Sequence, residues 1–548
     1  MDCFHPAAGS PLNHHPFLGA MFDMVFLIGA IAVVLGVPAA LFGLLSVFSL
    51  PAEDPTDSSR IVGAVFVVVA AAALIVVHVG ADRALRHVVE RRPLVMTKAV
   101  TISRVAVVAV VAVVAWWARP VFHGVVMLLY VYPLVTWIPL LVGFAVVAVC
   151  VLGAVAARRE ARAGLRFGLA WQTFAAVVSW IVFMALLPSW QGQALYAASS
   201  YIDTTSLPLT TQPRLLPKVA ARDRGDLRDA HLVVDPSSGQ LAWSAEHKGG
   251  FILRGSSDGV VVQPLDRVDA SVTRTRGGFS PALSEVGPGS LTWEAAKRHY
   301  FTRVQERVVV PLGGGRAVAI APYIGYRGFP VRHPYWRAVY VYHQGGTIED
   351  LTPQEAMRRP ELARSGRLFP EKLARRIADA YGYGPSGTEI DDPRGNPQPY
   401  LTNLGDGQIR WVTVGHPRGD DSTVATIFLT DAAGGRTLVW HAPPGRRLLS
   451  NEGAAQLTRT LDIEWNNCCD SDGTSTPLRF VSEPRPVFAR GRFFYVVSIL
   501  PEKALKTPEA VDRTVVIDAQ KRRIVKVVDH ADSDADEDLR AFFAGEAR

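Results

Sequence analysis

The stretch between residues 466 and 474 holds the residue types best suited to bind a metal ion. Asp470 and Asp472 stand two residues apart and are followed by Thr474. Oxygen ligands at alternate positions begin the loops that bind Ca²⁺. The Glu that closes the usual Ca²⁺ loop is absent, so a solvated Asp/Gly turn is the alternative. The sequence thus offers Asp470 and Asp472 as weak Ca²⁺ ligands, and no other cofactor is expected.

Two adjacent cysteines, Cys468 and Cys469, precede these aspartates. If they oxidise to each other, they form a vicinal disulfide, a small ring that fixes a tight turn. Free thiols and a crosslink between two chains are the alternatives. Cys3 and Cys150 are poor partners because they lie in or beside a strongly apolar region. Four cysteines in 548 residues exclude a disulfide-dense scaffold.

Scattered acid and base side chains offer the remaining chemistry, namely Asp391, Asp392, His416 and Glu464. Two carboxylates that meet in a cleft would support general acid–base catalysis, and dispersal over surface loops would count against it. The sequence has no zinc-protease helix motif, phosphate-binding loop, dinucleotide fingerprint or nucleophile elbow. We therefore assign no catalytic residue and favour a non-enzymatic protein. A cell-envelope enzyme with an unusual site is the alternative.

Glycine turns between two apolar strands recur four times and would position such side chains. The clearest pair is residues 239–243 and 407–411, and looser copies begin at Gly315 and Gly491. A glycine turn followed by alternating apolar residues is typical of a β-hairpin. A helix-like segment precedes each hairpin, over residues 213–227, 292–304, 370–381 and 452–461.

This recurrence predicts an α+β domain of about four repeats, each a helix followed by an antiparallel sheet. The alternative is one irregular β-rich domain whose hairpins are alike by chance. The expected parts are a linker at 189–212, repeats at 213–285, 286–360, 361–450 and 451–530, and an acidic helix or tail at 531–548.

A second hairpin follows in at least three of the repeats, and one example lies in the last. There an apolar strand at 514–517 leads through Asp518 to a second apolar strand at 524–528, and a similar turn contains Asp431. This strand–turn–strand pattern resembles PepSY-like and cystatin-like modules. It departs from them at His343, where the turn lacks Asp, and in the first repeat. The resemblance implies a binding, scaffolding or inhibitory role without intrinsic catalysis.

Long apolar stretches dominate residues 1–188. About 20 apolar residues cross the hydrocarbon core of a bilayer. Basic loops at 83–98 and 158–166 indicate the cytoplasmic side. We therefore expect a membrane α-helical bundle with its amino terminus in the cytoplasm and its carboxyl-terminal domain outside, in a multi-pass plasma membrane protein. The expected spans are 21–50, 61–79, 100–117, 121–156 and 165–187. The stretch 121–156 is either one kinked span or a re-entrant piece plus a span.

The formal net charge of +7 is mild for 548 residues, and it gives no nucleic-acid footprint. Polar residues at mid-span are few, so a transporter is kept only as a further alternative. We expect the repeats to bind or scaffold envelope polymers or other membrane or envelope proteins, beside the lipid bilayer. Five aromatic residues mark either a binding surface or a core, namely Tyr323, Tyr326, Phe329, Tyr335 and Trp336.

Overall fold

The computed structural model describes the chain mainly from residue 189 onward. The chain divides into two compact units, Met1–Leu186 and Leu187–Arg548. The described residues are 189–211, 228–236, 238–248, 257–265, 273–280, 283, 290–329, 331–384, 388–390, 399–405, 407–420, 422–465, 478–482, 484–501, 511–530 and 534–545, with isolated positions 123, 127, 130, 131, 178 and 186.

Sheets I and II are each built from strands that follow one another in the chain. Sheet I has the order β2-β3-β4-β5, and sheet II has the order β10-β9-β8-β6 with β7 also paired to β8. The strands of sheet I are β2 (Arg228–Val234), β3 (Leu241–Lys248), β4 (Ser257–Pro264) and β5 (Thr273–Arg276). Those of sheet II are β6 (Arg303–Val304), β7 (Val308–Gly313), β8 (Arg316–Arg327), β9 (His333–His343) and β10 (Ile348–Leu351).

Strand β8 shows why sheet II forms, because both of its faces are buried. Val318 and Ile320 pack in one core cluster, while Ala319, Ala321 and Tyr323 pack in another. Successive side chains of a strand point to opposite faces, so one apolar run serves two cores. Helices near this sheet are α8 (Leu291–Arg298), α9 (Pro353–Met357) and α10 (Pro360–Ala363).

Sheet III has the order β1-β16-β15-β13-β11, with β12 also paired to β13. Its strands are β1 (Tyr201–Thr204), β11 (Thr388–Ile390), β12 (Tyr400–Asn403), β13 (Ile409–Pro417), β15 (Thr426–Asp431) and β16 (Thr437–His441), and helix α11 (Glu371–Tyr381) precedes β11. A separate ribbon pairs β14 (Thr423–Val424) with β17 (Leu448–Leu449).

Sheet IV has the order β18-β20-β21-β22, with β19 also paired to β20. Its strands are β18 (Arg479–Val481), β19 (Arg485–Ala489), β20 (Arg492–Pro501), β21 (Arg513–Asp518) and β22 (Arg523–Asp529). Helices α12 (Asn451–Thr458) and α13 (Ala535–Ala544) stand before and after it in the chain. Leu539 and Phe543 of α13 pack in one cluster with Val516 of β21.

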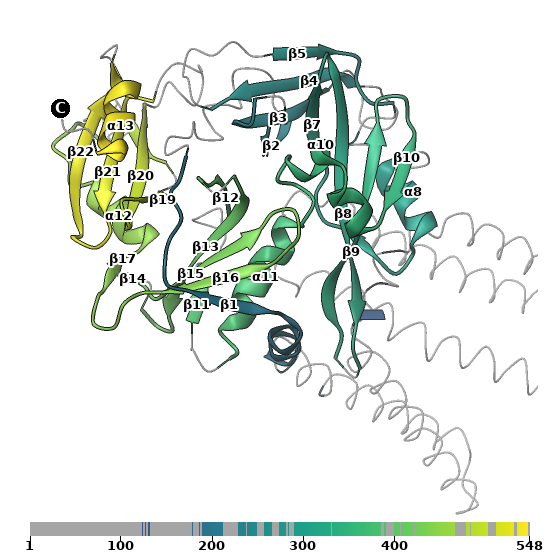
Figure 1. Cartoon of the computed structure of the whole chain (residues 1–548), viewed down its shortest axis with the longest axis horizontal. Coiled ribbons are helices and arrows are strands. Elements are labelled where there is room, and N and C mark those ends of the chain that lie inside the picture. Colours follow the sequence, from purple (N-terminus) through teal and green to yellow (C-terminus); the bar gives the residue numbers. More distant parts are fainter. Residues whose placement is uncertain are drawn as a thin grey trace, which may run out of the picture. The chain divides into compact units, whose positions relative to one another are not determined.

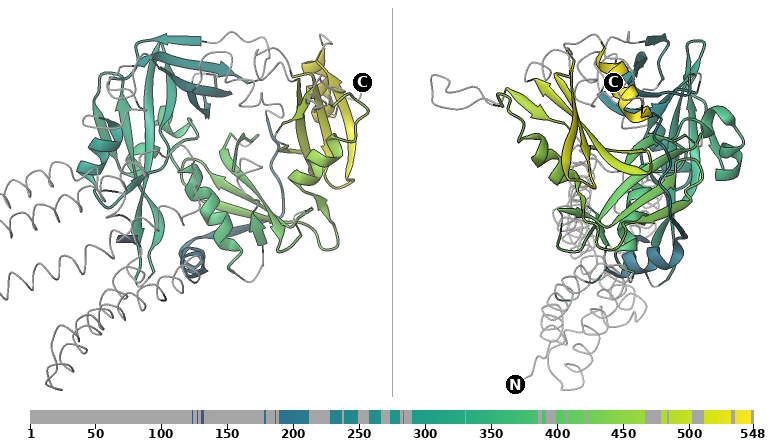
Figure 2. Two further views of the ribbon diagram at one scale, coloured as in Figure 1. Left: turned by 180° about the vertical axis from the view of Figure 1, so that it is seen from behind. Right: turned by 60° about the vertical axis from the view of Figure 1, so that its left-hand side comes forward.

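The four sheets stand around a common centre in a four-bladed, propeller-like arrangement (Figure 1; Figure 2 shows two further views). The central core cluster takes side chains from every sheet, with Leu232 from β2, Ile324 from β8, Trp411 from β13 and Leu500 from β20. The apolar faces of the sheets therefore bury one another in a shared core.

The four predicted glycine turns are hairpin turns, with one in each sheet. They join β2 to β3, β7 to β8, β12 to β13 and β19 to β20. Gly239 and Gly407 have φ values of 69° and 73°, in the left-handed region that glycine adopts without steric cost. The helices expected at 370–381 and 452–461 are observed as α11 and α12. Helix α8 ends before the expected residue 304, because β6 begins at Arg303.

The predicted fold class, a membrane α-helical bundle with α+β repeats, is wrong for the structure observed. The described chain is mainly β-sheet, and its apolar residues fill strands rather than long helices. Among the described residues, no helix is long and apolar enough to cross a membrane, which contradicts the expected transmembrane helices and the multi-pass plasma membrane localisation. Apart from the isolated positions named above, the expected spans 21–50, 61–79, 100–117, 121–156 and 165–187 lie outside the described residues.

The segment expected to be a linker has regular structure. Residues 189–198 are helical, and β1 pairs in parallel with β16. Further along, the Thr210 amide donates to the Phe488 carbonyl at 2.8 Å, and the Phe488 amide donates to the Thr210 hydroxyl at 2.9 Å. This segment therefore joins sheet III to sheet IV by hydrogen bonds. The repeat boundaries stay a prediction.

A buried ionic group links β2 to helix α11 and to the segment between β6 and β7. The Arg367 side chain is 2% exposed; it donates to the Leu232 carbonyl of β2 and, at 2.6 Å, to the Glu371 carboxylate. The Glu371 amide donates to Glu306 Oε1 at 2.8 Å. Burial, reinforced by the negative charge of Glu371, raises the pKa of Glu306 to about 7. Glu306 Oε2 is buried without a hydrogen-bond partner in the described structure, as a protonated carboxyl group tolerates more easily than a carboxylate.

Candidate functional site

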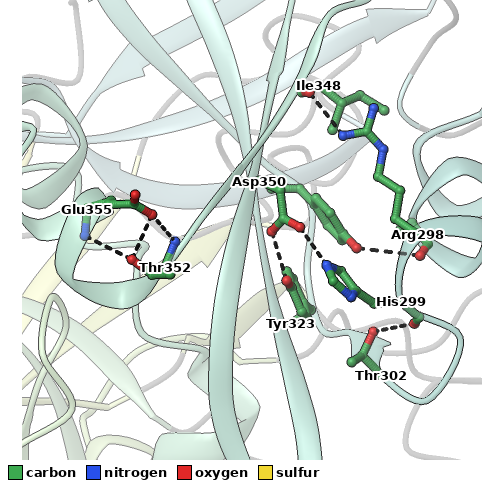
Figure 3. Close-up of polar contacts among 10 residues, drawn as sticks. Arg298, His299, Thr302, Tyr323, Ile348, Asp350, Thr352 and Glu355 are labelled. Carbon is green, nitrogen blue, oxygen red and sulfur yellow. Dashed lines mark hydrogen bonds and ion pairs between the residues drawn. The ribbon is translucent and has the colours of Figure 1, made fainter.

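The structure brings one histidine and one aspartate together in sheet II, and we call this group, with Tyr323 and Tyr340, the Asp350 cluster (Figure 3). His299 is the residue that ends α8, and Asp350 lies on β10. His299 Nε2 lies 2.5 Å from Asp350 Oδ2, and the Tyr323 hydroxyl donates to Asp350 Oδ1 at 2.8 Å. The carboxylate therefore accepts from two side chains that come from different elements.

Aromatic stacking fixes these groups in place. The Tyr323 and Tyr340 rings stack with centroids 4.4 Å apart, and the His299 ring stacks on Tyr323 at 5.5 Å. Burial and the hydrogen bond to Asp350 raise the pKa of Tyr323, while burial and the charge of Asp350 raise the pKa of Tyr340. Both hydroxyls therefore keep their protons at neutral pH.

An Asp–His pair of this kind can orient an imidazole as a general base. Here the pair connects the end of α8 to β10, and the neighbouring contacts also link these elements or the helix that follows them. Arg298 donates to the Ile348 carbonyl at 3.2 Å, and a capping box between Thr352 and Glu355 starts α9 directly after β10 (Figure 3). The cluster thus ties the end of α8 to the edge strand β10. We interpret it as a structural group.

A cavity of about 170 Å³ lies elsewhere in the same unit, beside the outer end of the β8–β9 hairpin. Its wall combines residues of helix 189–198, the hairpin, α11 and β16. The apolar wall includes Leu195, Trp336, Phe369, Leu373 and Ile377, and Trp336 packs edge-on against Phe369 at a centroid distance of 5.5 Å. Pockets for drug-sized ligands hold about 300–1,000 Å³. This cavity is smaller than such pockets, so it suits a single amino-acid side chain or a small molecule of similar volume.

The polar part of the wall carries donors and no acidic side chain. Ser199, Ser200, Arg327, His333 and Thr437 line it, and none of the described lining residues is Asp or Glu. The Ser199 hydroxyl donates to the Leu195 carbonyl at 2.7 Å, so it is already engaged. Arg327 is exposed at the end of β8, where its guanidinium lies 5.1 Å from the Tyr335 ring centroid. The charge at this end of the cavity is positive.

The tautomer of His333 follows from its hydrogen bond to Arg327. Arg327 Nε donates to His333 Nε2 at 3.2 Å. A guanidinium only donates, so Nε2 is the acceptor and Nδ1 carries the hydrogen. Burial and the charge of Arg327 lower the pKa of His333, which keeps the ring neutral at pH 7. Nδ1 is shielded from solvent and has no partner in the described part of the chain.

Of the side chains predicted as sites, the structure describes only His416 and Glu464. Cys468, Cys469, Asp470, Asp472, Asp391 and Asp392 lie outside the described residues. His416 is 1% exposed, and its Nδ1 lies 2.6 Å from the Thr423 carbonyl oxygen. Glu464 is exposed. Within the described ranges, no group of three or more His, Cys, Asp or Glu residues could hold a metal ion.

The aromatic group expected between 323 and 336 divides between core and surface. Tyr323 is 1% exposed and Trp336 is partly buried, whereas Phe329 is 85% exposed. Sequence reasoning missed the pairing of His299 with Asp350, which are 51 residues apart, and the role of Arg327 and His333. A useful signal was present in the sequence, because basic residues stand on both sides of Gly328 and Phe329.

The comparisons with known proteins add no family to this geometry. No protein-family model matches the chain, and no similar sequence is found among curated proteins. The resemblance to PepSY-like and cystatin-like modules therefore stays a prediction.

Proposed function

We propose that this protein is a binding protein that holds a protein partner at the end of the β8–β9 hairpin. The observation that carries the proposal is Phe329, an aromatic side chain that is 85% exposed beside the cavity wall residues Arg327 and His333. Aromatic and arginine side chains at the centre of a contact supply most of the energy in many protein interfaces. A binding role is also what the resemblance to PepSY-like modules implies.

The hairpin end has the position of a docking element. β7 and β6 pair with β8 only as far as Ile324, and β10 pairs with β9 only from Val339 onward. Beyond these points β8 and β9 pair with each other alone, up to Arg327 and His333. The hairpin accordingly extends past the rest of sheet II (Figures 1 and 2). A partner can reach Phe329 without disturbing the shared core.

The partner expected from the sequence, an envelope or membrane protein, stays a prediction. The proposed role needs neither Asp470 and Asp472 nor the cysteines 468 and 469. It also needs no chemistry at the Asp350 cluster, which we interpret as structural.

Site-specific photocrosslinking in the native cells tests the proposal. A photoreactive phenylalanine analogue, p-benzoylphenylalanine, replaces Phe329 in the full chain. A matched chain carries it at Phe301, another exposed phenylalanine of the same unit at 46% exposure. We expect an adduct of defined mass at position 329 and not at 301, and we expect Trp336→Ala to reduce it. Equal adducts at both positions, or none at 329, would contradict a docking role for the hairpin.

A further inference from the structure

The cavity beside the hairpin carries hydrogen-bond donors that lack acceptors. The Ser200 hydroxyl and the terminal nitrogens of Arg327 have no hydrogen-bond or ion-pair partner in the described structure. The Trp336 indole N–H, in the same wall, is shielded from solvent and is also unmatched among those residues. Arg327 and Ser200 are exposed, so water can serve their free donors. Buried polar groups of native proteins are nearly always paired, so the shielded Trp336 N–H is the donor that indicates an acceptor-bearing ligand in the cavity.

The positive charge of the cavity wall favours a negatively charged acceptor group on the ligand. Arg327 is the cation at the mouth, and the described lining residues include no carboxylate to neutralise it. The His333 Nδ1–H adds a further unmatched donor at this end of the hairpin. Arginine binds a carboxylate through two parallel hydrogen bonds, and such charge-assisted bonds are stronger than neutral ones. An anionic group of carboxylate size fits this arrangement.

The buried part of the cavity is lined by apolar side chains, so it favours an apolar group on the ligand. Leu195, Phe369 and Leu373 are buried at 7%, 5% and 1% exposure, whereas Arg327 and Ser200 are exposed. An occupant therefore points an apolar group inward and keeps its charge at the mouth. The terminal residue of a polypeptide does this, because its side chain and its carboxylate leave the same Cα atom. An internal Asp or Glu brings the charge without the apolar group.

We propose that the cavity binds the carboxyl-terminal residue of a partner polypeptide, with an aliphatic side chain inside and the terminal carboxylate on Arg327 and Ser200. This rests on the proposed function, because it names the part of the partner that the hairpin end receives. The volume of about 170 Å³ admits one residue and no more. The rest of the partner contacts Phe329 and the surface of the hairpin.

Calorimetric titration of the purified full-length protein with two small probes tests the proposal. N-acetyl-leucine carries the terminal carboxylate, and N-acetyl-leucinamide is the same molecule without the charge. We expect the carboxylate probe to bind at least about tenfold more tightly than the amide, as the loss of a charge-assisted hydrogen bond implies. Equal affinity of the two probes would overturn the proposal.

Matched arginine variants locate the bound carboxylate. Arg327→Gln should reduce affinity for N-acetyl-leucine about tenfold or more, while Arg316→Gln, at the opposite and equally exposed end of β8, should leave it unchanged. The indole N–H resonance of Trp336, assigned with Trp336→Phe, should shift with the acid and not with the amide. Equal loss in both arginine variants would indicate general electrostatic attraction and would contradict a site at the cavity.

Peptide probes separate the terminal carboxylate from its competitors and from the proposed function. A tripeptide with a free carboxyl-terminal Leu should bind at least about tenfold more tightly than its amidated form and than an amidated peptide with internal Glu. Comparable binding of the Glu peptide would overturn the terminal assignment. If crosslinking at Phe329 succeeds while no carboxylate binds, this inference alone fails. If the acid binds while no partner crosslinks, the proposed function fails and the cavity is a small-molecule site.

Discussion

The Asp350 cluster and the hairpin cavity both contain polar and aromatic side chains, but they differ in hydrogen bonding. We call a polar group matched when it has a hydrogen-bond partner among the described residues, and unmatched when it has none. In the cluster, the Asp350 carboxylate accepts from Tyr323 and lies against His299 Nε2 at 2.5 Å. In the cavity wall, the terminal nitrogens of Arg327 and the Trp336 indole N–H have no acceptor among the described residues, although Arg327 Nε donates to His333 Nε2. A matched group stabilises the fold and has no need of a ligand. An unmatched group retains hydrogen-bonding capacity, which a partner can use.

Glu306 tests this comparison, because its Oε2 atom has no hydrogen-bond partner among the described residues and yet we assign it no ligand. Its folded pKa of about 7 lies above the ordinary value of 4.5, so the folded chain keeps a proton that the unfolded chain releases between these values. The contribution of Glu306 to stability should be largest below pH 4.5 and should fall by about 3 kcal/mol as the pH rises to about 7. Unfolding free energies of the wild type and Glu306→Gln at pH 5 and pH 8 measure this. The variant should lose that pH dependence, and an unchanged slope would contradict a protonated Glu306.

Asp350→Ala tests the matched group, because it removes the hydrogen-bond acceptor at the centre of the Asp350 cluster. The substitution leaves the Tyr323 hydroxyl, which lies in a residue only 1% exposed, without its acceptor. An unsatisfied buried donor costs about 1–3 kcal/mol, so we expect a loss of about 2 kcal/mol in unfolding free energy. Binding of N-acetyl-leucine should not change. A stable Asp350→Ala protein would show that the cluster does not hold α8 to the sheet.

Tyr323→Phe should have a smaller effect of the same kind. It removes a 2.8 Å hydrogen bond and keeps the ring stacked on Tyr340, so we expect a loss of about 1 kcal/mol in a denaturant titration. Tyr340→Phe is the control, because its hydroxyl lies 3.4 Å from the Ala295 carbonyl oxygen and makes a weaker bond. Equal losses in both variants would point to ring packing rather than to the carboxylate.

Arg327→Gln should have the smallest effect on stability. Arg327 is exposed and forms no ion pair within the described residues, so the unfolding free energy should change by less than about 1 kcal/mol. A thermal unfolding scan without ligand measures this. A larger loss would show that Arg327 belongs to the fold, and the contrast between the two regions would weaken.

Local rules predicted the hairpins well. Gly239 and Gly407 supply the left-handed backbone that a turn needs, and this requirement is visible in a single residue type. The spacing of Leu373 and Ile377 similarly predicted α11, whose buried face includes Leu373 and Ala374. Such signals lie within a few residues of the feature that they describe.

Longer-range features were not predictable in this way. The pairing of His299 with Asp350 depends on where α8 ends and on the register of β10 against β9, 51 residues later in the chain. The separation of Tyr323 from Phe329 depends on where β8 ends, because Tyr323 is buried inside the strand and Phe329 follows its last residue, Arg327. The predicted fold class gave too little weight to strands. In the described part of the chain, apolar residues fill sheets that share a core, and hydropathy alone does not predict how such sheets assemble.

The most direct test of the contrast is a titration of N-acetyl-leucine into three full-length proteins, the wild type, Arg327→Gln and Asp350→Ala. If unmatched donors mark the binding site, Arg327→Gln loses about tenfold or more in affinity, while Asp350→Ala loses stability and binds as the wild type does. Loss of binding in Asp350→Ala, with full binding retained in Arg327→Gln, would contradict the account.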